Sequence, residues 1–148
     1  MNESDFLGLI PHRRPFLFID EVIELSADRI VTAVRADSQA DFFTGHYPGN
    51  PLMPGVLICE CAFQAGALLV AHRLDETARS TAMPVLTRIK EAKFRQIVRP
   101  GQTLNVEVVL DDELDGAYFM TGRVSVEGKP ALRVEFACTL TAAGEGGS

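Results

Sequence analysis

The feature that most constrains the fold is a proline-free apolar run, VLICECAFQAGALLVAHRL, which begins at Val56 after a loop rich in glycine and proline. Its length and its alanine and leucine content predict a helix, and apolar residues on nearly every face predict that this helix is buried all round. About 17 helical residues span roughly 25 Å, enough to cross a small domain. The rest of the chain must therefore wrap around this helix.

The remaining sequence predicts strands on both sides of the helix. Two strands are expected before it, at residues 16–25 and 29–36, and about four after it, at residues 85–98, 103–110, 117–126 and 132–141. This order predicts an α+β hot-dog fold, a curled antiparallel sheet wrapped around one long central helix. Such a sheet leaves an open edge, so we expect a dimer that extends it.

Smaller features complete the predicted organisation. A short helix is expected in ESDFLGLI behind a Ser4 cap. Glycine and proline should keep residues 42–54 irregular, and the polar residues 73–83 are also expected to be irregular. We expect a single domain over residues 1–141 and a flexible tail, rich in glycine, at residues 142–148.

Composition excludes several classes of protein. The 148 residues carry a net charge of −6, which argues against nucleic acid as the main partner. Three cysteines without framework spacing argue against a disulfide-stapled secreted domain. Glu3 and Asp5 stand where a signal peptide would carry basic residues, which argues against a signal peptide. Glu60 and Gln64 interrupt the apolar run, which argues against a transmembrane helix. A cytoplasmic protein with reduced thiols is the expected result.

Glu60 is the most informative residue because its neighbours in the run are apolar. An ionised carboxylate buried there without a partner would cost several kcal/mol. It must therefore find a partner, raise its pKa or face a cavity. Gln64 lies one turn further on the same face. The alternative is a structural carboxylate that is satisfied in the core or that tethers two subunits.

His46 lies 14 residues before Glu60, in a loop stiffened by glycine and proline. The loop could direct its imidazole toward this helix or toward the helix of a partner chain. A histidine and a buried acid beside an apolar groove form a general acid/base pair at neutral pH. A histidine in a loop can also be inert.

The segment Pro54–Val56 opens the helix. Its first N–H groups have no acceptor within the helix, and Gly55 would let a ligand approach the backbone closely. The N–H groups of Gly55 and Val56 could therefore hold a carbonyl oxygen that gains negative charge, although the segment could also be a plain helix start. Base, acid and oxyanion donor together predict proton abstraction next to a carbonyl, with loss or addition of water.

No other motif supplies chemistry. The histidines lack metal-ligand spacing, and Cys59 and Cys61 point to different faces of the helix. No nucleophile elbow and no phosphate-binding glycine loop is present in the sequence. We expect no metal and no nucleotide cofactor.

Four segments carry a resemblance that spans about residues 10–140. They are IPHRRPFLFID, GHYPGNPLMPGVLICECAFQ, AKFRQIVRPGQTL and VEGKPALRVEFACTL. Together they resemble the FabZ-type (3R)-3-hydroxyacyl-acyl-carrier-protein dehydratases of the FabA/FabZ hot-dog family. The second segment is long and specific.

The resemblance implies a dimer as the unit, often three dimers in a hexamer, with the active site between subunits. His46 matches the catalytic base, Glu60 the acid from the other protomer, and Gly55 the backbone donor to the thioester carbonyl. Val56 and Gln64 lie in the same segment, and we expect them to bind the substrate. Glutamate at position 60, where FabA-type enzymes have aspartate, favours dehydration without isomerisation. The implied reaction converts a 3-hydroxyacyl thioester on an acyl carrier protein into the trans-2-enoyl thioester, in fatty acid synthesis.

A local excess of cations could serve an acidic carrier. Residues 88–99 contain one acid, Glu91, and five cations, Arg88, Lys90, Lys93, Arg95 and Arg99. Such a stripe can steer an acidic partner, and it could equally be a solvated strand face.

The chain departs from the family at Val85 and Leu86, where an aromatic pair is common, and at Lys90, where an acid is common. These departures concern acyl-chain gating and carrier binding. They leave open a divergent paralogue of another lipid or polyketide pathway. Two further hypotheses are a thioesterase on the same fold and a non-catalytic acyl-binding subunit.

Overall fold

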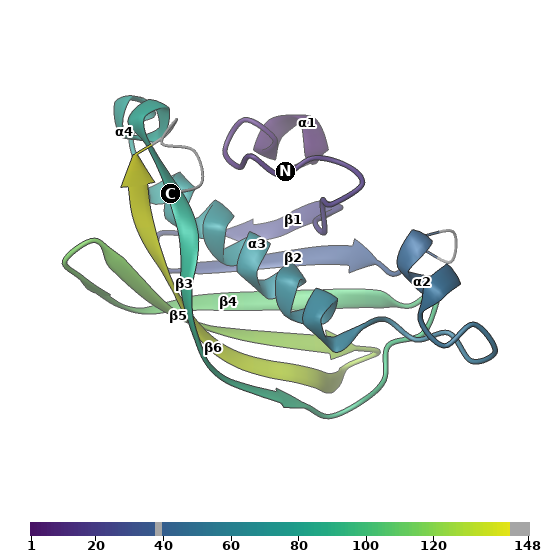
Figure 1. Cartoon of the computed structure of the whole chain (residues 1–148). Coiled ribbons are helices and arrows are strands. Elements are labelled where there is room, and N and C mark those ends of the chain that lie inside the picture. Colours follow the sequence, from purple (N-terminus) through teal and green to yellow (C-terminus); the bar gives the residue numbers. More distant parts are fainter. Residues whose placement is uncertain (38–39, 143–148) are drawn as a thin grey trace.

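The computed structural model describes residues 1–37 and 40–142, which form one sheet curled around one helix (Figure 1). The helices are α1 (Glu3–Phe6), α2 (Asp41–Gly45), α3 (Gly55–Arg73) and α4 (Glu76–Thr81). The strands are β1 (Glu21–Leu25), β2 (Arg29–Arg35), β3 (Ala82–Phe94), β4 (Thr103–Leu114), β5 (Ala117–Val126) and β6 (Lys129–Ala142). The predicted α+β hot-dog architecture is confirmed.

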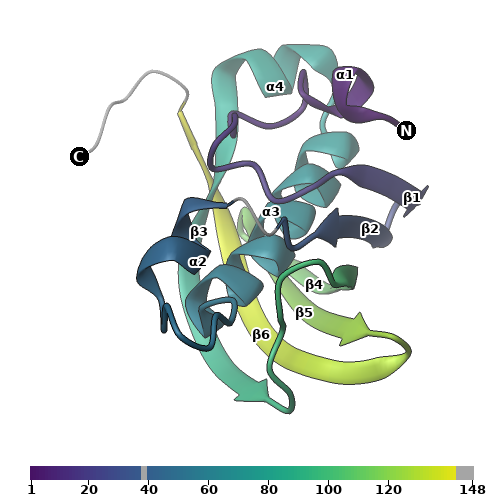
Figure 2. The ribbon, with the colours of Figure 1, turned by 90° about the vertical axis from the view of Figure 1, so that its right-hand side faces the viewer.

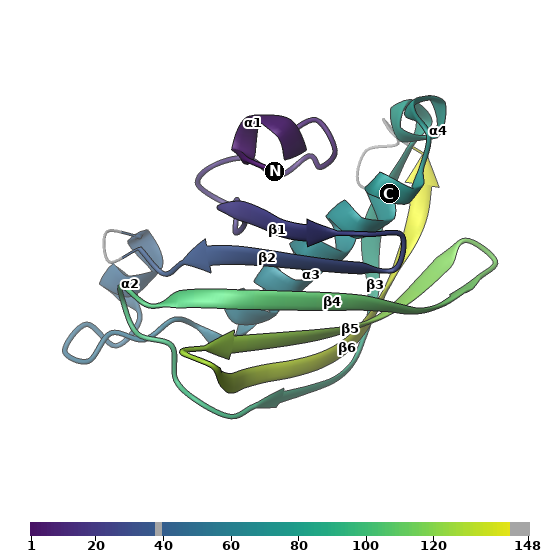
Figure 3. The same cartoon turned by 180° about the vertical axis from the view of Figure 1, so that it is seen from behind.

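The sheet has six strands in the order β1-β2-β4-β5-β6-β3, and all neighbouring strands are antiparallel. Viewed from behind, the strands cross in front of α3 as a continuous curved layer (Figure 3). Figure 2 looks toward the start of α3 and shows the sheet curving around the helix. β1 and β3 form the two edges of this sheet.

The helix α3 packs against the concave face so closely that two positions require glycine. A Cβ on Gly66 would lie 2.7 Å from the Phe136 ring, and one on Gly122 of β5 would lie 2.9 Å from the Cβ of Ala62. By length and composition α3 could cross a membrane, but 72% of its apolar window is buried inside this domain. Its apolar surface is therefore accounted for by the core of the sheet.

The N-terminal segment covers the side of α3 that the sheet leaves open (Figure 1). Arg14 fastens this segment by hydrogen bonds to Glu3 and Asp20, at 2.9 and 2.8 Å. Asp20 in turn accepts the backbone N–H of Arg35 at 2.7 Å. Arg14 and Asp20, which both belong to the motif IPHRRPFLFID, therefore hold the N-terminal segment against β2.

Several predicted boundaries were wrong. The cap of α1 is Asn2, whose side chain accepts the N–H of Asp5, and not Ser4. The first predicted strand, residues 16–25, was too long, because only β1 is a strand. The backbone groups of Phe16 and Phe18 instead bind the side chain of Gln64 on α3. Residues 73–83 contain α4, capped by Asp75, and α2 extends into the segment expected to be irregular. Of the predicted tail, only Ala142 lies within the described residues, as the end of β6.

Candidate active site

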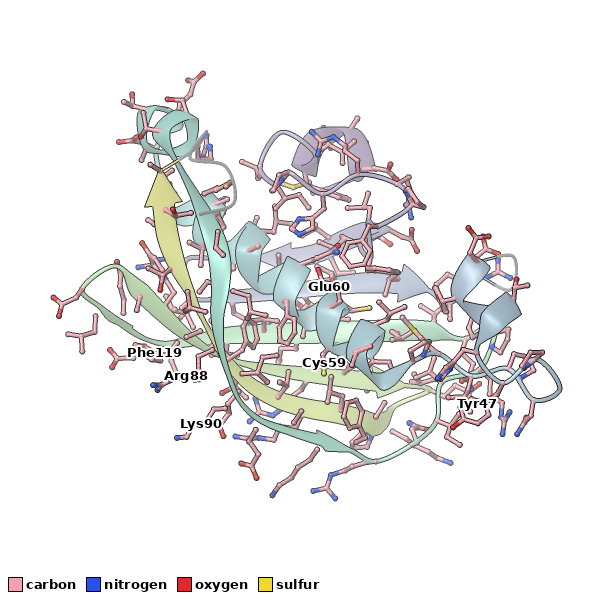
Figure 4. The ribbon with its side chains drawn as sticks, in the orientation of Figure 1. Tyr47, Cys59, Glu60, Arg88, Lys90 and Phe119 are labelled. Atoms are coloured by element: carbon pink, nitrogen blue, oxygen red, sulfur yellow. The ribbon has the colours of Figure 1, made fainter. Side chains whose placement is uncertain are left out.

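Glu60 lies on the side of α3 that faces the N-terminal segment, whereas Cys59 points to another side of the helix (Figure 4). Its side chain is 20% exposed, and Oε2 accepts a hydrogen bond of 2.9 Å from Nε2 of Gln64. Burial raises the pKa of Glu60, and the hydrogen bond from Gln64 opposes that rise only in part. The carboxyl group is thereby suited to hold a proton that it can donate.

Gln64 is fully buried and fixes Glu60 to the N-terminal segment. Its Oε1 accepts the N–H of Phe18 at 2.7 Å, and its Nε2 donates to the carbonyl of Phe16 at 3.0 Å as well as to Glu60. The N–H of Phe18 determines which end of the amide is oxygen. The sequence suggested that Gln64 binds substrate, whereas these contacts favour a role in positioning the acid.

His12 is a neighbour of Glu60 that the sequence analysis did not single out. Its Nε2 lies 3.8 Å from Oε2 of Glu60. Burial, followed by the nearby charge of Arg13, lowers the pKa of His12. Among the described residues, its Nδ1 is buried and has no hydrogen-bond partner. The available signal was its place in the segment IPHRRPFLFID, one of the four that carry the family resemblance.

A cavity of about 300 Å³ opens beside Glu60 and His12. Apolar side chains line most of it, including Val85 and Leu86 of β3, the two positions at which gating was in question. Cys138 also lines it, but burial raises the pKa of this thiol to about 12. At neutral pH the thiol is therefore protonated and is a poor nucleophile.

His46 directly follows α2, and its Nδ1 lies 3.0 Å from the carbonyl oxygen of Leu52. A carbonyl oxygen only accepts, so Nδ1 carries the hydrogen and Nε2 of the neutral ring keeps a lone pair. The ring also packs edge-on against Tyr47, with 4.8 Å between centroids. The loop thus holds His46 in the tautomer that a general base requires.

Within one chain, His46 and Glu60 are separate. The interactions of the described residues include none between them, and His46 does not line the cavity beside Glu60. Figure 4 shows Tyr47, the next residue, beyond the start of α3, while Glu60 lies further along the helix. One chain therefore presents an acid and a base in two different places.

The start of α3 lies between these two places. The ring of Phe94 covers Gly55 so closely that a Cβ there would lie 2.9 Å from its Cε1 atom. Val56 is 75% exposed, so the first turn of the helix reaches the surface. The N–H groups of Leu57 and Ile58 donate to the carbonyl of Pro54, at 2.9 and 3.2 Å, whereas those of Gly55 and Val56 have no acceptor within the helix. The role of these two N–H groups as oxyanion donors stays a prediction.

Comparison with known proteins identifies the family. A model of the FabA-like domain matches residues 10–135. The chain belongs to the FabA-like domain family. It is 36% identical over 138 residues to the 3-hydroxyacyl-[acyl-carrier-protein] dehydratase FabZ of Rickettsia massiliae (strain Mtu5), covering 93% of this chain and 94% of the relative. The FabZ of Rickettsia bellii (strain OSU 85-389) is 33% identical over the same coverage.

Solved structures support the fold of this FabA-like chain. The dehydratase heterocomplex ApeI:P from Xenorhabdus doucetiae is similar with a TM-score of 0.78 at 16% identity, over 90% of this chain and 89% of that chain. Protein smu.793 from Streptococcus mutans UA159, bound to acetyl CoA, has a TM-score of 0.68 at 11% identity, over 90% and 96% of the two chains. At these identities the likeness concerns the fold alone.

The cations predicted to meet a carrier divide into two groups in this FabA-like domain. Arg88 and Lys90 project from β3 away from α3 (Figure 4). Arg99 instead donates a 2.7 Å hydrogen bond to Oδ1 of Asn50, whose own N–H bonds to the carbonyl of Tyr47. Arg99 therefore braces the loop that carries His46.

The sheet register adds two cations that the sequence analysis missed. Lys93 lies directly opposite Arg133 on β6, and Arg133 lies opposite Arg123 on β5. Arg95, Arg123 and Arg133 line a pocket of about 400 Å³ on the outer face. Each cation of the row also pairs with a carboxylate: Lys93 with Glu91 at 3.3 Å, Arg133 with Glu135 at 3.5 Å and Arg123 with Glu107 at 3.9 Å. Exposed ion pairs are weak and like charges directly opposite each other repel, so the row can still attract an anionic partner. The register of three strands determines this arrangement, and local sequence gives no signal for it.

Within residues 1–37 and 40–142, no group of three or more His, Cys, Asp or Glu side chains is arranged to hold a metal ion.

Proposed function

We propose that this chain is a 3-hydroxyacyl-[acyl-carrier-protein] dehydratase of fatty acid biosynthesis. The observation that carries the proposal is Glu60, a carboxyl group with a raised pKa beside a largely apolar cavity. A buried acid that keeps its proton is what elimination of a hydroxyl group requires. The family and the similarity to two FabZ dehydratases support the same reaction.

In the proposed reaction, Nε2 of His46 removes the proton from the carbon next to the thioester carbonyl. Glu60 gives its proton to the hydroxyl group on the neighbouring carbon, which leaves as water. The electron pair of the broken C–H bond forms the double bond of the trans-2-enoyl thioester. The N–H groups of Gly55 and Val56 stabilise the carbonyl oxygen as negative charge develops on it. No redox step or external reductant is needed.

We propose that the working unit is a dimer in which His46 of one chain faces Glu60 of the other. The separation of the two residues within one chain supports this arrangement. β3 is an edge strand of 13 residues, and Val85, Ile89 and Phe94 on it are 41 to 53% exposed. A long edge strand that exposes apolar side chains favours pairing with a second copy. A hexamer of three such dimers in the cytoplasm is consistent with this proposal.

An acyl carrier protein is the proposed partner. Its acidic surface would meet the outer face at Arg88, Lys90, Lys93 and Arg95, extended by Arg123 and Arg133. Replacement of Arg123 and Arg133 by glutamate should lower kcat/KM for a carrier-bound substrate by about tenfold or more, since it removes two favourable contacts and adds two repulsive ones. A small pantetheine thioester should be converted at the rate of the unmodified protein. An equal loss with both substrates would contradict the carrier contact.

The reaction itself is tested by incubating the purified protein with a 3-hydroxyacyl thioester. Enoyl absorbance and free thiol are followed together. Appearance of the enoyl product without free thiol supports a dehydratase. Free thiol without enoyl product would show a thioesterase, and tight acyl binding without either product would show a non-catalytic acyl-binding subunit.

A further inference from the structure

His12 shares the cavity of the buried acid but has no part in the acid/base pair. Pro11 and His12, from the N-terminal segment, line this cavity together with Glu60. Ile10, which is only 3% exposed, anchors the backbone just before them. Nη1 of Arg13 donates to the carbonyl oxygens of Ile10 and His12, at 2.8 and 2.7 Å. The N-terminal segment therefore holds the His12 ring in a fixed place beside Glu60.

The spacing of the two side chains suits one oxygen atom that contacts both. Nε2 of His12 lies 3.8 Å from Oε2 of Glu60, which is too far for a direct hydrogen bond. An oxygen atom on the cavity side can lie about 2.8 Å from both groups. The side chains of His12 and Glu60 are 24% and 20% exposed, so both reach the cavity. In the proposed reaction, the leaving hydroxyl group brings an oxygen atom to this place.

The buried side of the His12 ring determines which nitrogen carries the hydrogen. Among residues 1–37 and 40–142, its Nδ1 has no hydrogen-bond partner and is buried. Burial, and then the charge of Arg13, lowers the pKa of His12, so the ring is neutral at neutral pH and carries one N–H. A buried N–H without an acceptor is rarer in proteins than a buried lone pair without a donor. We therefore place the hydrogen on Nε2, the nitrogen on the side of Glu60.

We propose that His12 is a third catalytic residue, which donates its Nε2–H to the oxygen atom of the leaving hydroxyl group. The proposal rests on the proposed function, which brings that hydroxyl group to Glu60. An alcohol oxygen has two lone pairs. One takes the proton of Glu60 and the other accepts from His12, while the C–O bond breaks and its electron pair stays on the oxygen. His12 keeps its own proton, so the product is water and no further reactant is needed.

This hydrogen bond strengthens as the reaction proceeds. Negative charge develops on the leaving oxygen, and Glu60 then becomes a carboxylate beside a largely apolar cavity. Gln64 supplies one donor to this carboxylate, at 2.9 Å. His12 supplies a second donor through the water that has formed. A donor to developing charge stabilises the transition state more than the bound substrate, so His12 should affect kcat more than KM.

Few other ionisable groups of the described residues face this pair. Arg13 faces His12 from the same segment, and β3 contributes no ionisable side chain to the cavity. The remaining neighbours are thiols with a pKa raised by burial, which stay neutral at neutral pH: Cys59 and Cys61 on α3, and Cys138 on β6. In the proposed dimer, His46 of the other chain also faces Glu60. Variants of His12 keep all these groups, so comparing them isolates the effect of His12.

Two substitutions that differ by one methylene group separate a hydrogen-bond role from a structural one. In His12→Gln the amide N–H group can reach the place of Nε2, whereas in His12→Asn it reaches only the place of Nδ1. His12→Asn should lower kcat for a 3-hydroxyacyl pantetheine thioester by about tenfold or more, the scale of one hydrogen bond to a charged group. Its KM should change by less than about threefold.

His12→Gln should restore kcat to within about threefold of the unmodified protein. His72→Asn is the matched control, because His72 lies at the exposed end of α3 and should leave kcat unchanged. Thermal unfolding checks that each variant is folded. Equal kcat in His12→Asn and His12→Gln would overturn the proposal.

The pKa of Glu60 gives a second readout that needs no turnover. Glutamate carboxyl groups are isotope-labelled for NMR, and the signal that is lost in Glu60→Gln identifies Glu60. In the substrate-free protein a water can take the place of the hydroxyl oxygen. A donor to the carboxylate favours its charged form, so the pKa of Glu60 should be higher in His12→Asn than in His12→Gln. The same pKa in both variants would overturn the proposal.

The two readouts separate this proposal from the proposed function. If the unmodified protein dehydrates no 3-hydroxyacyl thioester while the pKa of Glu60 still differs between the two His12 variants, the proposed function fails and the donor role of His12 stands. If dehydration occurs at the same rate in every His12 variant, the role of His12 fails and the proposed function stands.

Discussion

The two residues of the proposed acid/base pair occupy opposite kinds of environment. Glu60 sits on a buried helix, and Gln64 ties it to two backbone groups of a covering segment. His46 sits at the end of a short helix in a surface loop, held by one hydrogen bond to Leu52 and supported by the Asn50–Arg99 contact. The acid is fixed by the core, whereas the base is fixed by local loop geometry.

This difference follows from the chemistry of each group. A carboxyl group that must keep its proton needs burial, because burial disfavours its charged form. A histidine base needs a free ring nitrogen directed outward at the substrate, and a carbonyl that accepts from the other nitrogen is enough to select the tautomer. A loop at the surface can offer this nitrogen to a neighbouring chain, which a core position cannot.

The largest effect is expected from removing either member of the pair. Glu60→Gln or His46→Ala should lower kcat by about a thousandfold or more, since each removes a proton-transfer group. Both variants should keep the fold, because glutamine can accept from Gln64 and His46 lies outside the core. Circular dichroism and gel filtration check the fold. Near-normal turnover in either variant would remove that residue from the mechanism.

Gln64→Leu should destabilise the buried surroundings of Glu60 and leave the loop that carries His46 unchanged. It leaves the buried N–H of Phe18 and the partly buried carbonyl of Phe16 without partners, which should lower the free energy of unfolding by about 2–4 kcal/mol. Urea denaturation measures this loss. Gln96→Leu is the matched control, because Gln96 makes only exposed hydrogen bonds, to two carbonyls at the start of β6. This change should cost under about 1 kcal/mol. Equal losses would contradict the positioning role of Gln64.

The raised pKa of Glu60 makes a prediction about stability and pH. Because the folded-state pKa lies above the unfolded value, the folded chain binds this proton more tightly than the unfolded chain does. The resulting stability is fully present below the ordinary glutamate range and is lost as pH rises through the raised pKa of Glu60. The difference in free energy of unfolding, Glu60→Gln minus the unmodified protein, should therefore become more positive as pH increases across this window. A difference that is constant with pH would contradict the raised pKa.

The smallest effect is expected in the loop. Arg99→Ala removes an exposed hydrogen bond to Asn50, worth about 0.5–1 kcal/mol, so kcat for a pantetheine thioester should fall about two- to fivefold. Asn50→Ala should cause a similar loss, and the double variant should lose no more than either single one. Additive losses would show that the two residues act separately.

The sequence predicted the central helix, the sheet around it and the place of Glu60 because these follow from strong local patterns. A long apolar run must be buried, and an acid within it must be accommodated. It did not predict the contact between His12 and Glu60 or the row formed by Lys93, Arg133 and Arg123. Both arise from pairings between distant segments, which depend on strand register and on how the N-terminal segment closes over α3.

The central claim is that acid and base meet only across two chains, and a mixed dimer tests it most directly. Glu60→Gln and His46→Ala chains with different affinity tags are co-expressed, and dimers carrying both tags are isolated. Such a dimer has one complete site and one site lacking both groups, because a two-fold interface repeats each contact. The account predicts about half the turnover of the unmodified dimer. Mixed dimers as inactive as either parent would contradict it.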